Sequence, residues 1–186
     1  MSDMTMMAEK WGIVFKLMDI NKDGVVSSQD KDFCKTVFSG LSTSDDNTGL
    51  LKDLDFYWDK MTFPGESPDW DQQVSEEQFI QRYSKLFSSD KAATVKMINE
   101  AVKCLLTAAD IDGSKVFTFG KFFNFHEAFN LAHEIIVRTT FNLIGPGPED
   151  TCTFDQMHGF YVELFIGEDQ AKFETLKTAY KALGMM

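Results

Sequence analysis

The residues best suited to chemistry lie in one short run near the start of the chain, from Asp19 to Asp30. Oxygen-bearing side chains occupy positions 1, 3, 5, 9 and 12 of this run, and a glycine occupies position 6. Ca²⁺ is a hard cation that takes about six to eight oxygens at about 2.3–2.6 Å, so a short loop must aim several carboxylates inward to bind it. The run therefore predicts a Ca²⁺ site. Its predicted ligands are Asp19, Asn21, Asp23, the Val25 backbone carbonyl, Ser27 and Asp30.

This spacing is that of the twelve-residue loop of an EF-hand. Ser27 is expected to act through a water molecule, and Val26, at position 8, to point into the core. Gly24 has a conformational role and is not a ligand: the chain must turn sharply at position 6 with a positive φ, which glycine adopts at little cost. A polar turn between helices is the alternative, but it leaves the alternating acids, the glycine and the apolar position 8 unexplained together.

Position 12 departs from the usual pattern. Most EF-hands have a bidentate Glu there, whereas this loop has Asp30, which is one methylene shorter. We expect Asp30 to reach the ion with one oxygen, or only after the loop tightens. The lower coordination number narrows the preference for Ca²⁺ over the smaller Mg²⁺, so Mg²⁺ is expected to compete for the same site.

Apolar residues spaced three and four apart predict helices on both sides of this loop and in three later units. The units recur at intervals of roughly 45–50 residues, as in an internal repeat. The predicted helices are 4–18, one after Asp30 that carries apolar residues 33–41, 50–61, a long one that begins after Asp90 and leads to Asp110, one through 135–143, and 168–183, with a polar linker at 42–49.

The second and fourth turns keep the layout of an EF-hand loop without its metal ligands. In the second, Val74 marks position 8, and the ligand positions are Ser67, Asp69, Asp71, Ser75 and Gln78. In the fourth, Cys152 marks position 8, and the ligand positions are Gly145, Gly147, Glu149, Thr153 and Gln156. We interpret both turns as structural.

The third turn is a weaker candidate metal site, with Asp110, Asp112 and Ser114 at positions 1, 3 and 5. Lys115 replaces the glycine of position 6, and Lys121 places a positive charge at position 12. A cation so close to the ion would oppose its binding.

The predicted fold is all-α, with four EF-hand units in two paired lobes that form one compact body and with an extra C-terminal helix. The lobes are predicted at residues 1–88 and 90–186. EF-hands pair through short β-bridges at position 8, which would set Val26 against Val74 and Phe117 against Cys152.

Composition narrows the classes of partner. The net charge of -11 argues against nucleic acids and anionic membranes and fits cation binding. The first ten residues lack the basic and apolar regions of a signal peptide, and no run reaches the ~20 apolar residues of a membrane span. We therefore expect a cytoplasmic monomer whose partners are metal ions. The scattered Cys34, Cys104 and Cys152 suit a reducing compartment.

The chain resembles the sarcoplasmic calcium-binding proteins of invertebrates, and the molluscan kind in particular. The resemblance rests on Trp11 before the first loop, on Tyr57-Trp58-Asp59 before a loop broken by Pro and Gly, on the Val74–Phe79 segment, on Asp110-x-Asp112, and on a Pro-rich fourth loop before Phe160-Tyr161. It implies a compact buffer of Ca²⁺ and Mg²⁺ in the sarcoplasm. The related calexcitins and coelenterazine-binding photoproteins share the architecture.

Several functions stay open. The leading hypothesis is a Ca²⁺ buffer; a sensor would open a Met-rich groove, and a scaffold would use loop 1 only for stability. A luciferin-type carrier would need a cavity among the 18 Phe side chains. Catalysis is disfavoured, since His126-Glu127 and His133-Glu134 are seven residues apart, not four as in zinc proteases.

Overall fold

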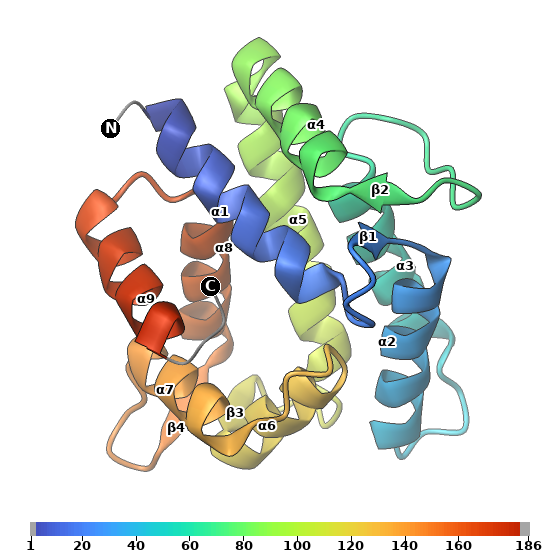
Figure 1. Ribbon diagram of the computed structural model, residues 1–186. Coiled ribbons are helices and arrows are strands. Elements are labelled where there is room, and N and C mark those ends of the chain that lie inside the picture. Colours follow the sequence, from blue (N-terminus) through green and yellow to red (C-terminus); the bar gives the residue numbers. More distant parts are fainter. Residues whose placement is uncertain (1–2, 183–186) are drawn as a thin grey trace.

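The computed structural model describes residues 3–182, most of which are helical (Figure 1). The helices of this part are α1 Asp3–Met18, α2 Ser28–Leu41, α3 Thr48–Thr62, α4 Glu76–Ser89, α5 Lys91–Ala109, α6 Phe119–Glu127, α7 Glu134–Ile144, α8 Phe154–Ile166 and α9 Gln170–Ala182. Short strands lie between them: β1 Val25–Val26, β2 Val74–Ser75, β3 Val116–Thr118 and β4 Thr151–Thr153. The predicted all-α fold with short bridges and a C-terminal helix is confirmed.

Each helix that leaves a loop starts after a Ser or Thr at loop position 9. These N-caps are Ser27, Ser75, Thr118 and Thr153. In loop 2, Ser75 Oγ accepts from Gln78 N at 3.3 Å, and Gln78 Oε1 accepts from Ser75 N at 3.0 Å. Such capping boxes satisfy amides that the first helical turn leaves free. Because position 12 is the third residue of each exit helix, its side chain is fixed at the mouth of the loop.

The loops pair two by two through antiparallel strands. Val26 lies opposite Val74, and Phe117 lies opposite Cys152, as predicted. All four position-8 side chains are buried, so each bridge fixes two loops side by side over the core.

One core joins the first and second halves of the chain. α3 packs along α5, and α8 contacts both α1 and α5 (Figure 1). Trp11 stacks on Tyr83 with ring centroids 5.6 Å apart, and Trp58 stacks on Phe129 at 6.3 Å. The boundary between α4 and α5 is the single residue Asp90; the division into lobes at residues 1–88 and 90–186 stays a prediction.

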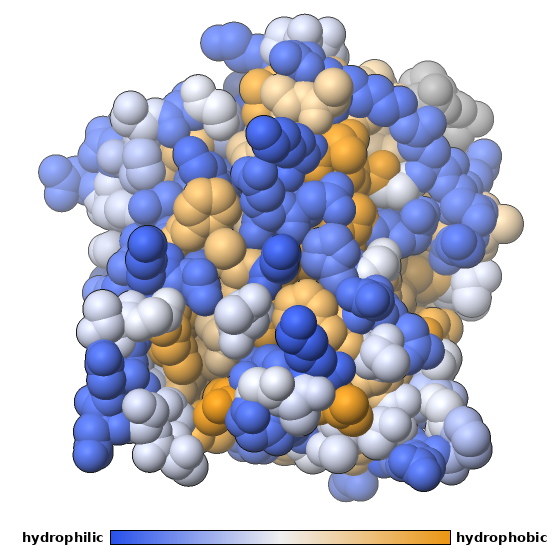
Figure 2. Space-filling model, turned by 180° about the vertical axis from the view of Figure 1, so that it is seen from behind, coloured by the Kyte–Doolittle hydropathy of each residue, from blue (hydrophilic) through white to orange (hydrophobic). Residues whose placement is uncertain are grey.

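The surface exposes few large apolar side chains. Figure 2 shows one face of the molecule, on which hydrophobic residues form separate patches between hydrophilic ones. Within the described residues, the exposed large hydrophobic side chains are Phe33, Val116 and Ile135. No helix of residues 3–182 is long and apolar enough to cross a bilayer.

Several element boundaries differ by a few residues from those predicted, and α2 begins at Ser28, ahead of Asp30. α9 begins at Gln170, not at 168, because Asp169 accepts a hydrogen bond from Lys172 N at 3.1 Å and so caps the helix. α3 begins at Thr48, which shortens the predicted linker. Leu183, predicted as the last apolar residue of the final helix, lies outside the described residues.

Candidate metal centre

Loop 1, residues 19–30, passes through left-handed backbone at two residues. Gly24, at position 6, has φ +89°, as its predicted role requires. Lys22 has φ +61°, and its ammonium turns away from the loop to donate to the carbonyl of Lys16 at the end of α1. Burial lowers the pKa of Lys22. The carbonyls at a helix C-terminus suit a cation, so Lys22 is bound outside the loop.

The side-chain oxygens at positions 1, 3 and 5 of loop 1 are oriented by the loop's own amides. Asp19 Oδ1 accepts from Asp23 N at 3.2 Å, and its Oδ2 accepts from Gly24 N at 3.1 Å. Asn21 Oδ1 accepts from Asp23 N at 3.0 Å, and Asp23 Oδ1 accepts from Val25 N at 3.1 Å. Asn21 Nδ2 also donates to Asp23 Oδ2 at 2.9 Å. The loop therefore brings three of the predicted ligands together.

Asp30 closes the loop. It is 1 % exposed, and each of its oxygens accepts two hydrogen bonds. Oδ1 accepts from Ile20 N at 2.8 Å and Asn21 N at 3.2 Å, whereas Oδ2 accepts from the amide and hydroxyl of Ser27 at 2.9 and 3.2 Å. Asp30 thus ties the first residues of loop 1 to the start of α2. Its contact with an ion, and that of Ser27, stay predictions.

The donor set of loop 1 suits a divalent cation, with one position that must adjust. Asp19, Asn21, Asp23 and the Val25 carbonyl supply hard oxygens, which Ca²⁺ and Mg²⁺ prefer. Among residues 3–182, however, no group of three or more His, Cys, Asp or Glu side chains is arranged to hold a metal ion. In loop 1, the Asp30 carboxylate is bound to the backbone amides of Ile20 and Ser27.

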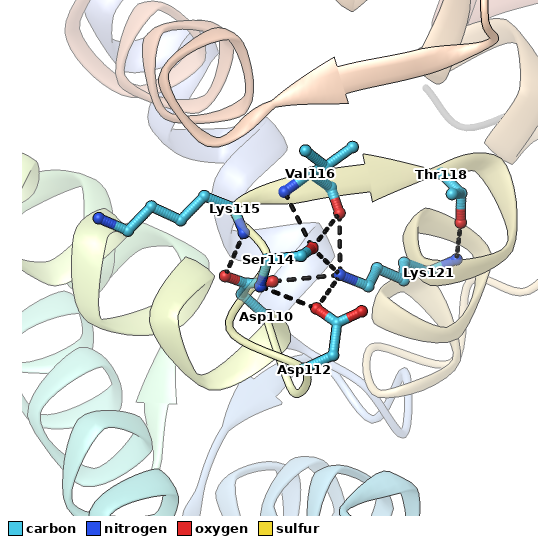
Figure 3. A network of polar contacts seen from close by, with 7 residues as sticks. All are labelled: Asp110, Asp112, Ser114, Lys115, Val116, Thr118 and Lys121. Carbon is cyan, nitrogen blue, oxygen red and sulfur yellow. Dashed lines mark hydrogen bonds and ion pairs between the residues drawn. The ribbon is translucent and has the colours of Figure 1, made fainter.

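Loop 3, residues 110–121, surrounds a cation that belongs to the chain itself (Figure 3). Lys121 Nζ lies 3.2 Å from Asp110 Oδ1, 2.8 Å from Ser114 Oγ and 2.8 Å from the carbonyl oxygen of Val116. It also donates to Asp112, and this contact holds the pKa of the Asp112 carboxyl well below its usual range. The three side chains predicted as a weaker metal site therefore bind a lysine ammonium here.

Loop 2 is held from α4. Arg82 donates to Gln72 Oε1 at 3.3 Å and to the Thr62 carbonyl at 3.1 Å, and its guanidinium lies 5.0 Å from the centre of the Phe63 ring. Gln72, at position 6, is not among the residues with positive φ, so loop 2 has lost the turn that loops 1 and 3 keep. A side chain outside the twelve residues fixes its shape.

Loop 4 is closed by an amide and an ion pair. Gln156 Nε2 donates to the Gly145 carbonyl at 2.9 Å, which joins positions 12 and 1 directly. Arg138 donates to both carboxylate oxygens of Asp150, at 2.8 and 2.9 Å. The structural interpretation of this turn agrees with these contacts.

A separate cavity of about 40 Å³ lies in the core. Tyr57, His126 and Tyr161 line it, and the buried Tyr161 hydroxyl has no hydrogen-bond partner among residues 3–182. His126 Nδ1 lies 2.8 Å from the Phe122 carbonyl, so Nδ1 carries the proton and Nε2 is left as an acceptor. Burial lowers the pKa of His126 to about 4.

Sequence reasoning missed the positions of the in-chain cations. It treated Lys121 only as a positive charge that repels a metal ion. In the structure, the Lys121 ammonium itself contacts the loop oxygens that would otherwise bind a metal ion. The signal was present: a long basic side chain at position 12, after oxygens at positions 1, 3 and 5. Arg82 lies four residues beyond loop 2, and no loop spacing points to it.

Comparison with known proteins gives one relative over almost the whole chain. It is a sarcoplasmic calcium-binding protein of Mizuhopecten yessoensis, 26% identical over 180 residues, which cover 95% of this chain and 98% of the relative. No family model matches the chain. The predicted resemblance to this class of protein is confirmed.

Solved structures give the same fold. Coelenterazine-binding protein of Renilla muelleri, in a calcium-loaded apo form, superposes with a TM-score of 0.68 and 14% identity, covering 92% of this chain and 94% of its own. A complex of apoaequorin with (S)-HM-daCTZ gives a TM-score of 0.67 and 14% identity, covering 94% of this chain and 91% of its own.

Proposed function

We propose that this EF-hand protein, which is similar to the sarcoplasmic calcium-binding proteins, binds one Ca²⁺ per chain in loop 1 and acts as a cytosolic buffer without catalytic activity. The proposed ligands are Asp19, Asn21, Asp23, the Val25 carbonyl, Ser27 and Asp30. The description of the Mizuhopecten yessoensis relative as a calcium-binding protein supports the choice of ion.

The observation that carries this proposal is the contrast between loops 1 and 3. Both loops have oxygens at positions 1, 3, 5 and 7, but in loop 3 these oxygens bind Lys121. In loop 1, the nearby Lys22 donates to Lys16 instead. Among the described residues, no hydrogen bond or ion pair joins a side-chain cation to Asp19 or Asp23, although the Lys22 ammonium is near enough for its charge to be attracted by Asp19.

The dispersal of the methionines over α1, α3, α5 and α8 favours a buffer over a sensor. A sensor exposes a groove rich in Met when it binds Ca²⁺. The methionines buried in the core are Met6, Met7, Met18, Met61 and Met157. The strand bridges and the aromatic stacks between helices hold this core closed.

Asp30, at position 12, determines how strongly loop 1 prefers Ca²⁺ over Mg²⁺. A site without a bidentate Glu offers Ca²⁺ fewer oxygens and discriminates less against Mg²⁺. We therefore propose that Mg²⁺ occupies loop 1 when Ca²⁺ is scarce. Metal exchange would then set how fast the buffer responds.

Isothermal titration calorimetry with a matched pair of variants tests the site. Asp23 and Asp71 both stand at position 5, in loops 1 and 2. Wild type is expected to bind one Ca²⁺, Asp23→Asn to bind it at least tenfold more weakly, and Asp71→Asn to match wild type. Wild-type affinity in Asp23→Asn, or a loss confined to Asp71→Asn, would reject loop 1 as the site.

A second candidate function is binding of a small molecule in the core cavity. The Tyr161 hydroxyl, which has no partner among the described residues, favours it, because buried polar groups usually find partners. Proteins with this fold are described as bound to a coelenterazine analogue or as coelenterazine-binding. A volume of about 40 Å³ holds water rather than a drug-sized ligand, whose pockets measure about 300–1,000 Å³. A carrier would therefore have to open between its helices.

Fluorescence of the buried tryptophans checks this candidate. Titration with coelenterazine should quench or shift the emission of Trp58, which stacks on Phe129 of the cavity wall. The response should weaken in Tyr161→Phe and persist in Tyr180→Phe if the orphan hydroxyl makes the contact. Unchanged emission at saturating coelenterazine would remove the candidate.

A further inference from the structure

We propose that loop 3 is a cation site whose resident cation is the Lys121 ammonium, and that replacing Lys121 with Glu converts it into a second divalent-metal site. Loop 3 would thus be permanently occupied, at any calcium concentration. The inference concerns a different loop from the proposed calcium site, and the two can fail independently.

The first argument is the identity of the contacting atoms. Lys121 Nζ touches side-chain oxygens at positions 1, 3 and 5 and the carbonyl oxygen at position 7 (Figure 3). A Ca²⁺ ion in an EF-hand takes ligands from these same four positions. The ammonium therefore lies where the loop geometry places a metal.

The second argument is the state of the loop around it. Position 6 keeps its left-handed turn although it is Lys115, with φ +56°. Lys115 N donates to Asp110 Oδ2 at 2.9 Å, and the Lys115 side chain points away from the cluster (Figure 3). A residue held in a disfavoured conformation indicates that the surrounding contacts determine the loop. Loop 3 thus has the backbone of a metal-binding loop, without glycine at position 6.

The third argument is electrostatic. Asp110 is only 8 % exposed, and its carboxylate faces that of Asp112 across the ammonium. Asp112 is 56 % exposed, so the buried carboxylate of Asp110 is the one that most needs a cation beside it. Lys121 is the side chain that supplies it, from a position fixed as the third residue of α6.

The fourth argument compares Lys121 with the residues at position 12 of loops 1, 2 and 4. In loops 1, 2 and 4 the residue at position 12 accepts a hydrogen bond from the backbone of the N-cap residue and completes a capping box. Lys121 has no acceptor atom, so it cannot. Its side chain is directed into the loop instead, and it bridges β3 and the end of α5.

Two variants test the exchange of one cation for another. Lys121→Glu adds a carboxylate at position 12 beside Asp110 and Asp112, and calorimetry should count one more Ca²⁺ than in its parent. The comparison is made in wild type and in Asp19→Ala, so failure of loop 1 to bind does not obscure the result. Lys121→Met keeps the length of the side chain without its charge, and its midpoint of thermal unfolding in EDTA should fall by several degrees.

A measurement on the unaltered protein makes the test independent of variant folding. The ¹⁵N resonance of the Lys121 ammonium should be protected from solvent exchange at neutral pH, unlike that of Lys96, whose side chain is 78 % exposed. Addition of millimolar Ca²⁺ should leave it in place. Exchange as fast as that of Lys96, or displacement by Ca²⁺, would overturn the proposal, as would an unchanged midpoint in Lys121→Met.

Discussion

The ammonium of Lys10 lies 2.6 Å from the carbonyl oxygen of Gly167, which is 157 residues further along the chain. It also donates to the Glu163 carbonyl at 2.7 Å, so α1 caps the C-terminus of α8. Lys10 is 1 % exposed, and burial lowers its pKa. The contact joins the first helix to the last third of the chain.

Lys10→Met should destabilise the protein, because it removes a buried donor from two carbonyls and leaves the last turn of α8 without a cation. We expect a loss of about 1–3 kcal/mol in the free energy of unfolding, measured by urea denaturation. Lys172→Met is the control, since that side chain is 69 % exposed; its effect should stay within about 0.5 kcal/mol. Equal effects of the two variants would show that the Lys10 contact contributes no stability.

Asp30→Glu should lower the stability of the metal-free protein and raise its selectivity for Ca²⁺ over Mg²⁺. The longer side chain must displace the hydrogen bonds that Asp30 makes with Ile20, Asn21 and Ser27, so the metal-free protein should lose about 1–3 kcal/mol. With a bidentate carboxylate at position 12, Ca²⁺ affinity should rise relative to Mg²⁺ affinity. Calorimetry with each ion and melting in EDTA measure both effects. A Ca²⁺/Mg²⁺ ratio that stays constant would show that position 12 does not contact the ion.

Substitution of glycine at position 6 should raise the free energy of unfolding in loop 3 and lower it in loop 2. Lys115→Gly removes a non-glycine residue from left-handed backbone and should stabilise the protein by about 0.5–1 kcal/mol. Gln72 lies outside that region, so Gln72→Gly adds freedom to the unfolded chain and also removes the side chain to which Arg82 donates; it should cost at least about 0.5–1 kcal/mol. Chemical denaturation of both variants checks the signs. Two effects of the same sign would contradict this account of the turns.

Because of His126, the free energy of unfolding should decrease as the pH is lowered from 6.5 toward 4. Burial lowers its folded pKa from 6.5 to about 4, so below pH 6.5 the unfolded chain binds a proton that the folded protein does not. Its contribution is complete above pH 6.5 and is lost as pH falls toward 4, to a total of about 3 kcal/mol. His126→Gln should flatten this part of the curve, and His133→Gln, an exposed histidine, should not. Parallel curves for all three proteins would contradict the lowered pKa.

The fold could be predicted because its signals are local. Helical spacing of apolar residues located the main helices, and the apolar position 8 of each loop gave the strand register, including Val26 opposite Val74. The exit helices α4, α6 and α8 were predicted only as parts of the repeated helix–loop–helix units, without bounds of their own. The boundaries of α3 and α9 shifted because single side chains and backbone turns decide where a helix starts.

The candidate site could be predicted only in part. The contacts of Asp30, Lys121 and Arg82 depend on the directions that their side chains take in the folded protein. Loop spacing identifies Asp19 and Asp23 as candidate ligands, but it does not reveal that Asp30 binds four donors of its own loop. The direction of Lys121, like that of Arg82, follows from charges and packing that meet only in the folded chain. Such contacts leave no periodic pattern in the sequence.

Crystallography of protein grown in millimolar Ca²⁺ tests the central claim most directly, because anomalous scattering locates each ion. We predict one calcium peak per chain, in loop 1, with oxygens of Asp19, Asn21 and Asp23 at about 2.3–2.6 Å, and with Lys121 still in loop 3. A calcium peak in loop 3 with Lys121 displaced, or no peak in loop 1, would contradict the account.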